Sequence, residues 1–326
     1  MISRTIYIGN PAKLNVKNEQ LVVHRGDDDP RGLPIEDLGL VILDHGQITV
    51  SAACLQYLTQ SGVAVLVCGS SHLPIGLLLP LEDHHIHAQR LRAQVSAPRP
   101  RQKQLWQKLI QAKLRNQGAL LEAIHGEGSG SALLKWAKEV RSGDPNNLEA
   151  RGAVVYWRRI FPSLPDFSRG REGPPPNHLL NYGYAILRAM VARALVGTGL
   201  HPALGIHHIN QYNPFALADD CMEPFRPWVD ARAYDLWLSL GEDLPPELTP
   251  ELKKQLLPLP QDDVAIDGKR RPLQNAIQLF AASFAQALSK PKAPNLLLPD
   301  MEQTLSWRLL PEPPEMDESD VGLTPA

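Results

Sequence analysis

The sequence predicts an α+β protein in which a small β-rich N-terminal domain is followed by a larger, all-helical domain. Short β-branched and aliphatic runs, separated by turn residues, fill residues 1–82. From about residue 83 the apolar residues recur at spacings of three and four, which is the period of an amphipathic helix. With 326 residues, 43% of them hydrophobic, the chain is long enough to build both cores.

The N-terminal β-rich domain is expected to span residues 1–82. Clusters of Gly, Pro and Asn separate its apolar runs and predict turns between strands. One helix is expected among the strands, from Ser51 to Thr59, with Ser51 as its N-cap. The predicted strands are Thr5–Ile8, Gln20–Val23, Leu40–Leu43, Ile48–Val50, Val63–Val67 and Ile75–Leu79.

The helical domain is expected to span residues 83–299, with loops at Phe161–Pro176 and Pro245–Leu259. The predicted helices are Gln89–Val95, Gln104–Ile124, Ala132–Val140, Leu148–Ile160, Leu179–Leu195 and Leu273–Leu288. The remaining segment, residues 300–326, is rich in proline and acid. Such a segment has few apolar anchors, so it is expected to be a partly disordered tail.

Composition narrows the class of protein. No stretch of about 18 uncharged apolar residues occurs, so no membrane span is expected, and the first residues lack the apolar core of a signal peptide. The three cysteines, Cys54, Cys68 and Cys221, have no CxxC spacing, as expected for reduced thiols. The sequence therefore predicts a cytoplasmic protein.

Charge is unevenly distributed along the chain. The net charge is −2, but residues 300–326 alone carry −6, which leaves +4 on the rest. No acid occurs between Asp83 and Glu122, and such local basic patches, rather than net charge, bind a phosphate backbone. The stretch predicts nucleic-acid binding, with a solvated helix face as the alternative. Its bases are Arg90, Arg92, Arg99, Arg101, Lys103, Lys108, Lys113 and Arg115.

The segment Gly205–Asp230 has the highest density of residues that could carry chemistry. It contains His207, His208, Asp219, Asp220 and Glu223. If Leu217–Arg226 is helical, Asp220 and Glu223 lie on one face, where like charges often hold a cation between them. Pro224 predicts a kink or a helix start there. One histidine with two carboxylates suits Mg²⁺ or Mn²⁺ better than Zn²⁺.

Glu149 begins another predicted helix, for which Asn146 or Asn147 is the expected cap. A carboxylate in the first turn is favoured by the helix dipole, which would explain Glu149 without a catalytic role. Gly152 and Ala153 keep the next turn small, as if another group must approach closely. Both explanations of Glu149 stay open at this point.

Several segments resemble the CRISPR-associated Cas1 endonuclease and integrase family, most closely its type II members. They are LEARGAVVYW, LLNYGYAIL, GIHH with ADDCMEPFRPWVD, the opening RTIYIGN, and VSAACLQYLTQSGVAVLVCG. The resemblance covers nearly the whole chain, although the Pro174–Pro176 run and the acidic tail depart from the family pattern. It implies a small N-terminal dimerisation domain and a larger helical catalytic domain.

The resemblance also implies a site and a reaction. Glu149, His208 and Glu223 would be catalytic metal ligands for Mg²⁺ or Mn²⁺, with Asp220 as a candidate extra acid. The family ligand falls three residues after Gly205, which selects His208 over His207. The implied reaction inserts prespacer DNA into a CRISPR array by attack of a 3′-OH on a phosphodiester at the leader–repeat border, a step of antiviral defence. The implied assembly is a homodimer that joins a Cas2 dimer in a heterohexamer.

Contacts to double-stranded DNA are expected from the bases of residues 90–103, of the loop at 169–171 and of residues 269–271, and from Arg226. The alternative for Arg226 is that it pairs with an acid and so braces the site. The expected contact residues are Arg90, Arg92, Arg99, Arg101, Lys103, Arg169, Arg171, Arg226, Lys269, Arg270 and Arg271. Two alternative functions remain. One is a hydrolytic, structure-specific nuclease with the same metal site, and the other is a non-catalytic DNA-binding scaffold whose acids serve as caps and ion pairs.

Overall fold

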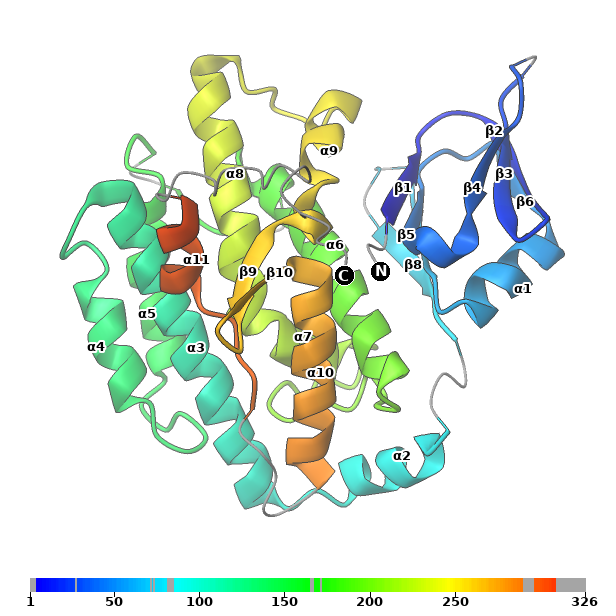
Figure 1. Ribbon diagram of the computed structural model, residues 1–326. Helices are drawn as coiled ribbons and strands as arrows, with labels where there is room; N and C mark the ends of the chain where they lie inside the picture. Colours follow the sequence, from blue (N-terminus) through cyan, green and yellow to red (C-terminus); the bar gives the residue numbers. More distant parts are fainter. Residues whose placement is uncertain are drawn as a thin grey trace, which may run out of the picture.

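The computed structural model describes residues 4–26, 28–70, 72, 74–80, 85–164, 167–170, 172–289 and 296–308. A small domain of β-strands lies beside a larger domain made mainly of helices (Figure 1). The α+β fold class predicted from the sequence is therefore confirmed.

Two four-stranded sheets form the β domain. The first sheet has the order β1 (Arg4–Ile8), β5 (Leu38–Leu43), β7 (Ala64–Cys68) and β8 (Pro74–Leu78). The second has the order β4 (Arg31–Pro34), β3 (Gln20–His24), β2 (Ala12–Lys17) and β6 (Ile48–Val50). Helix α1 (Ala52–Gln60) begins at Ser51, whose hydroxyl accepts the Cys54 N–H at 3.2 Å, so the predicted cap is confirmed.

Strand β5 is buried along its whole length because both of its faces are covered. Its side chains alternate between two cores. Val41 and Leu43 pack inside the β domain, whereas Leu40 and Ile42 belong to the core that the β domain shares with the helices. The continuous apolar run LGLVIL is typical of a strand covered on both sides, and here it joins the two domains.

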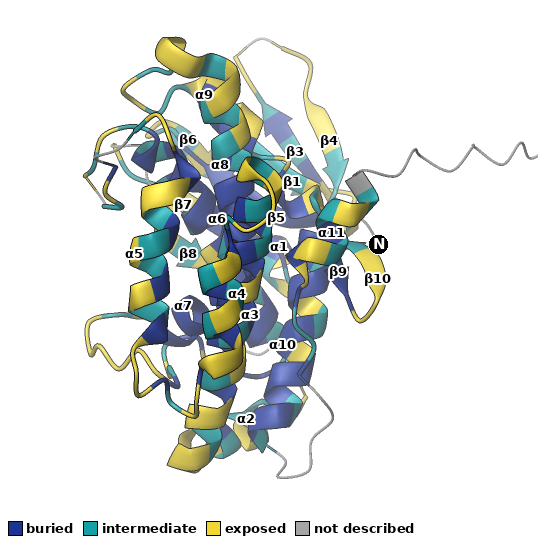
Figure 2. Cartoon of the chain, turned by 90° about the vertical axis from the view of Figure 1, so that its left-hand side faces the viewer, coloured by how far each residue is buried: buried dark blue, intermediate teal, exposed yellow. Residues whose placement is uncertain are grey.

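Two long buried helices, α3 (Arg99–His125) and α6 (Asn177–Gly197), organise the helical domain. Helix α6 also contacts β7 and β8 of the β domain. The other helices are α2 (His87–Val95), α4 (Ser131–Glu139), α5 (Leu148–Ile160), α7 (Ala216–Met222), α8 (Arg226–Leu240), α9 (Pro250–Leu256), α10 (Leu273–Ser289) and α11 (Met301–Arg308). Figure 2 shows the buried residues gathered along α6, α3 and α10, with exposed residues on α4 and α9.

Helix α6 is, within the described parts of the chain, the one helix long and apolar enough to cross a membrane. However, 78% of its apolar window is buried inside the protein. This degree of burial is typical of the core helix of a globular domain.

The helical domain departs from the sequence prediction in three places. It is not all-helical, because β9 (Asp263–Ile266) and β10 (Lys269–Pro272) form an antiparallel hairpin. Helix α9 lies in the predicted loop 245–259. Helix α11 lies within the predicted tail and packs on α3 and β9, whereas residues 309–326 lie outside the described residues. The domain limits at 82 and 300 stay predictions.

A buried ion pair connects the two domains. Nζ of Lys253 on α9 lies 2.5 Å from Oδ2 of Asp44, at the end of β5, and both side chains are almost completely buried. The Asp44 carboxylate also accepts the Tyr7 hydroxyl at 2.7 Å and lies 2.8 Å from Nδ1 of His72. Burial acts to raise the pKa of Asp44, but the hydrogen bonds from Lys253 and Tyr7 outweigh it and lower the pKa.

Candidate active site

Two of the predicted ligands, Glu149 on α5 and Glu223 at the end of α7, converge on a single ammonium group. Lys113 of α3 donates a hydrogen bond to Oε1 of Glu149, and its Nζ lies 2.7 Å from Oε2 of Glu223. The Lys113 side chain is only 7% exposed. Burial acts to lower the pKa of Lys113, but Glu223 and Glu149 outweigh it and raise the pKa, so the ammonium stays charged.

The sequence predicts Lys113 to be one of the bases of a stretch that binds nucleic acid or forms a solvated helix face, and for Lys113 this prediction is wrong because its register on α3 buries it. Leu109 and Ile110, four and three residues earlier, are buried, and so are Asn116 and Gln117, three and four residues later. Residues at these spacings share one helix face. Lys113 is therefore the site residue that the sequence reasoning missed, and the helical period could have revealed it.

Helix α5 is positioned by a cap and by a close contact with α3. Both oxygens of Asp144 accept backbone N–H groups at 2.9 Å, from Leu148 and from Glu149. Asn147 is the N-cap residue, as one of the two predictions had it, but its side chain makes no capping hydrogen bond and its backbone is left-handed with φ of 50°. Asp144 accepts the capping hydrogen bonds instead. A Cβ at Gly152 would lie 2.3 Å from Cδ2 of Leu114, so the group that approaches this glycine is α3 and not a ligand.

Glu223 lies where α7 ends and a short 3₁₀ turn, η2 (Glu223–Phe225), leads into α8. The break predicted at Pro224 is confirmed, and the buried Asn116 side chain binds the Pro224 carbonyl at 2.8 Å. Nε of Arg226 lies 3.0 Å from Oε1 of Glu223. Burial acts to raise the pKa of Glu223, but Arg226 and Lys113 outweigh it and lower the pKa to about 2.

Arg226 therefore braces the acid, which was one of its two predicted roles. Its guanidinium also lies 4.6 Å from the centre of the Tyr184 ring. A guanidinium over an aromatic face is stabilised by the negative charge of that face. The two contacts hold Arg226 beside Glu223 and leave the carboxylate between two cations.

Asp220 of α7 is fully buried and holds the histidine loop. Its carboxylate accepts the backbone N–H groups of Ile206 at 2.7 Å, His207 at 2.9 Å and His208 at 3.1 Å. Its Oδ1 also lies 2.5 Å from Nδ1 of His208. This hydrogen bond raises the pKa of His208, with burial opposing it. An imidazole that donates from Nδ1 to a carboxylate presents Nε2 as a metal ligand.

The two neighbouring histidines have different surroundings. The His207 ring stacks flat on Trp106 of α3, with ring centres 3.9 Å apart and an interplanar angle of 3°. Burial lowers the pKa of His207. The structure therefore gives His207 the contact that anchors the loop to α3, and gives His208 the hydrogen bond to Asp220.

The donor set fits a hard divalent ion. No group of three or more His, Cys, Asp or Glu within the described ranges lies close enough together to hold a metal as it stands. A cation nevertheless already lies between the carboxylates of Glu149 and Glu223, namely the Lys113 ammonium. The buried Oε2 of Glu223 lies within ion-pair distance of Lys113 but accepts no hydrogen bond of good geometry from the described residues. Carboxylate oxygens are the donors that Mg²⁺ and Mn²⁺ prefer, but between these two carboxylates the structure holds the Lys113 ammonium.

His208 lines an open groove of about 860 Å³ between the α2–α3 junction and residues 203–214. Three apolar side chains on this groove are strongly exposed, namely Val95 at 69%, Ile209 at 69% and Tyr212 at 83%. Arg99 also lines the groove. A large substrate can therefore reach His208 from solvent.

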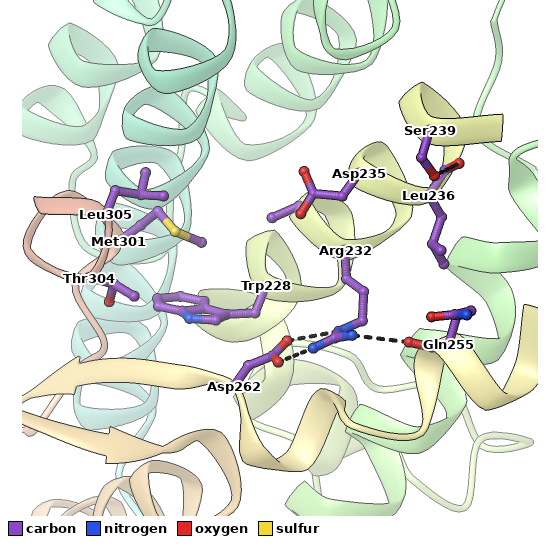
Figure 3. Close-up of a pocket in the computed structure, with 11 residues that line it drawn as sticks. Trp228, Arg232, Asp235, Leu236, Ser239, Gln255, Asp262, Met301, Thr304 and Leu305 are labelled. Carbon is purple, nitrogen blue, oxygen red and sulfur yellow. Dashed lines mark hydrogen bonds and ion pairs between the residues drawn. The ribbon is translucent and has the colours of Figure 1, made fainter. Parts of the chain in front are cut away.

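A second cavity, of about 320 Å³, lies among α8, α11 and the segment before β9 (Figure 3). Trp228 and Met301 provide apolar wall, and Arg232 forms a two-point ion pair with Asp262. None of the predicted ligands lines this cavity, and its arginine is already paired. It is therefore separate from the candidate site.

The predicted DNA-contact residues differ in their exposure to solvent. Arg92, Arg99, Lys103, Lys269 and Arg270 are exposed, although Arg270 also pairs with Asp263 at 2.5 Å. Arg271 is half-buried in β10, and Arg171 lies outside the described residues.

Three other predicted contacts, Arg90, Arg101 and Arg169, make contacts within the protein, and their DNA contacts stay predictions. Arg90 and Arg101 donate hydrogen bonds to the carbonyls of Ala285 and Ala287, which tie α2 and α3 to α10. Arg169 donates to Asn177 and lies 5.1 Å from the centre of the Tyr184 ring. These arginines are occupied by contacts within the protein.

The fold defines a class: a protein with a small β domain and a mainly helical part, in which Glu149 and Glu223 share the Lys113 ammonium. The family profile described as CRISPR associated protein Cas1 matches residues 6–238. The CRISPR-associated endonuclease Cas1 of Neisseria meningitidis is 33% identical over 301 residues, which are 92% of this chain and 97% of that protein. The CRISPR-associated endonuclease Cas1 2 of Pyrobaculum aerophilum is 29% identical over 85% of this chain and 96% of its own length. The chain belongs to the Cas1 family.

Solved structures share the fold at low sequence identity. A casposase bound to an integration product has a TM-score of 0.71 at 20% identity, covering 98% of this chain and 97% of its own. A Cas6-RT-Cas1–Cas2 complex has a TM-score of 0.68 at 19% identity, over 88% of this chain and 35% of the other. A TtCas1–DNA complex has a TM-score of 0.55 at 16% identity, over 90% and 95%.

Proposed function

We propose that this protein is a metal-dependent DNA integrase that inserts prespacer DNA into a CRISPR array. The observation that carries the proposal is the meeting of Glu149 and Glu223 on a buried cation. Glu223 also interacts electrostatically with His208, whose imidazole is fixed by Asp220. Two comparisons support it, because the Neisseria relative is named an endonuclease and a structural neighbour is a casposase bound to an integration product.

The chemistry proposed is a transesterification at phosphorus. The 3′-OH oxygen of the prespacer forms a bond to a phosphorus at the repeat border, and the bond from that phosphorus to the neighbouring 3′ oxygen breaks. One phosphodiester replaces another, so no nucleotide cofactor is needed. A Mg²⁺ or Mn²⁺ ion held by Glu149, His208 and Glu223 would stabilise charge on the reacting oxygens. Asp220 sets the histidine tautomer, and Arg226 keeps Glu223 ionised.

The groove beside His208 offers a path for the DNA strand. Arg99 lies on the groove, and Arg92 and Lys103 are exposed nearby in the sequence, on α2 and α3. These three residues are the best placed of the predicted contacts to neutralise phosphates. Lys269 and Arg270, at the hairpin, would contribute a further contact.

The proposed assembly is a homodimer that joins a Cas2 dimer, acting on DNA in the cytoplasm. Structural neighbours described as a Cas6-RT-Cas1–Cas2 complex and a TtCas1–DNA complex support the choice of partners. A hydrolytic nuclease is the second candidate function. It is favoured by the 45% exposure of the His208 side chain, because water can reach an open site as readily as a 3′-OH.

A strand-transfer assay separates these functions. The reaction contains supercoiled DNA with a leader and repeat, a prespacer, Mn²⁺ and the Cas2 partner. The proposal predicts joined products that His208→Ala abolishes, whereas His125→Ala, an exposed histidine at the end of α3, leaves them unchanged. Nicking without joining would favour the hydrolytic nuclease. Full strand transfer by His208→Ala would contradict the proposed site, and so would the absence of both nicking and joining by the natural protein.

A further inference from the structure

The charges around the two carboxylates cancel. Glu149 and Glu223 each carry one negative charge, and Lys113 and Arg226 each carry one positive charge. Lys113 and Glu223 are almost fully buried, with side chains 7% and 6% exposed. The four groups therefore form a neutral cluster in which Lys113 and Glu223 have little access to solvent, whereas Glu149 and Arg226 are partly exposed, at 28% and 24%.

Lys113 occupies the central position in this cluster. It binds Oε1 of Glu149 and lies beside Oε2 of Glu223, while Arg226 lies beside Oε1 of Glu223. Both oxygens of Glu223 therefore have a cationic neighbour before any metal arrives. The neighbours Ala112 and Leu114 are fully buried, so α3 cannot turn to carry Lys113 out to solvent.

A divalent ion that binds Glu149 and Glu223 must therefore compete with a built-in cation. Because the four side chains are already neutral together, the ion would add two positive charges that nothing balances. Unbalanced charge is costly in a site of low effective dielectric. A phosphodiester carries one negative charge, so two DNA phosphates at the site would restore neutrality. Ion and DNA would then each favour the binding of the other.

We propose that Lys113 makes divalent-ion binding depend on DNA: it holds Glu149 and Glu223 together in the free protein, and it keeps ion affinity low until phosphates supply the missing negative charge. This inference rests on the metal site of the proposed function. Lys113 acts through the two carboxylates, so it is a positioning residue.

The alternative is that Lys113 is only a structural ion pair. Removing it would then destabilise the fold without making the ion bind more tightly. The two explanations differ in the sign of one measurable quantity, the change in Mn²⁺ affinity of the DNA-free protein when Lys113 is replaced.

The test is a Mn²⁺ titration followed by electron paramagnetic resonance, which reports free Mn²⁺ and does not depend on activity. The full chain is compared with Lys113→Met and with Lys254→Met, which removes one exposed charge from α9. Each protein is titrated alone and with a duplex whose 3′ ends are dideoxy, and Mn²⁺ bound by the duplex alone is subtracted.

The expected results are specific. DNA tightens Mn²⁺ binding to the natural protein and to Lys254→Met by about tenfold or more. Lys113→Met binds Mn²⁺ about tenfold more tightly than the natural protein without DNA, and DNA adds much less to it. In EDTA, Lys113→Met has a lower melting temperature than the natural protein. Adding Mn²⁺ raises the melting temperature of Lys113→Met by more than it raises that of the natural protein.

Several outcomes would overturn the inference. One is Mn²⁺ affinity in DNA-free Lys113→Met that equals or falls below that of the natural protein. If Lys113→Met does not fold, the inference is tested on the natural protein alone. A change of less than twofold in its Mn²⁺ affinity when DNA is added would also contradict the inference. If either of these results is found while strand transfer still requires Mn²⁺ and His208, the inference about Lys113 fails and the proposed function stands. If no Mn²⁺ binds under any condition, the proposed metal site fails as well.

Discussion

Oδ1 of Asp220 lies 2.5 Å from Nδ1 of His208, and the same carboxylate accepts the backbone N–H of His208 at 3.1 Å. One buried acid thus fixes both the backbone and the ring of the histidine. The sequence offered Asp220 as an extra metal ligand, but in the structure its oxygens are occupied by four N–H groups. Asp220 therefore determines which ring nitrogen of His208 faces outward.

Asp220→Asn is expected to weaken Mn²⁺ binding about tenfold to a hundredfold, because an amide cannot fix the same histidine tautomer. The measurement is Mn²⁺ titration of the folded protein. Asp219→Asn is the matched control, since Asp219 pairs with Arg188 at 2.6 Å and with Asn213 at 2.7 Å and does not touch His208. Equal affinities in the two variants would show that Asp220 does not position the ligand.

Glu223 predicts a pH dependence of stability. Its pKa of about 2 lies below the ordinary value of 4.5, so the unfolded chain binds the proton more tightly. Its stabilising contribution, about 3 kcal/mol, is present above pH 4.5 and is lost as the pH falls toward 2. Urea unfolding of the natural protein and Glu223→Gln should converge over that range, and a constant difference would contradict the assignment.

Asp144→Ala is expected to lower the free energy of unfolding by about 1–2 kcal/mol, because two N–H groups at the start of α5 lose their acceptor. Urea unfolding at pH 7 measures the loss. Asn146→Ala, at one of the caps predicted from the sequence, should change stability by less than about 0.5 kcal/mol. A larger loss of stability in Asn146→Ala than in Asp144→Ala would contradict the assignment of the capping hydrogen bonds to Asp144.

Lys253→Met is expected to destabilise the protein by about 3–5 kcal/mol, because it leaves the Asp44 carboxylate buried without its main partner. The double variant Asp44→Asn, Lys253→Met should lose less than the sum of the single losses, since the pair is removed together. Lys254→Met, one residue away and exposed, is the control for unfolding in urea. Additive losses would mean that the two residues are not coupled across the domain junction.

Much of the fold could be predicted from the sequence because most elements have a clear period. Strand β2 was missed although AKLNVK alternates apolar and polar residues strictly, which is a strand signal. Strand β4, with the sequence RGLP, has no such alternation. The place of β4 depends on its pairing with β3, which no local pattern reveals. The β9–β10 hairpin also carried a local signal, because the dipeptide Asp267-Gly268 is typical of a two-residue hairpin turn. In the structure both residues adopt the positive φ values of such a turn.

The candidate site could be predicted only in part. His208, Glu149 and Glu223 were identified through the family resemblance, and the break at Pro224 followed from proline chemistry. The cation between the carboxylates was not predicted, because a lysine in a basic stretch is usually solvated. Its burial depends on packing of α3 against α5 and η2, through contacts such as the close approach of Gly152 to Leu114.

The central claim is that Glu149, His208 and Glu223 form one divalent-ion site. A crystal of the protein with DNA, grown in Mn²⁺ and measured at the manganese absorption edge, tests this claim most directly. The account predicts an anomalous peak within bonding distance of Nε2 of His208 and of both carboxylates, with Lys113 displaced from at least one of them. A bound DNA strand with no manganese peak there, and with Lys113 still bridging Glu149 and Glu223, would contradict it.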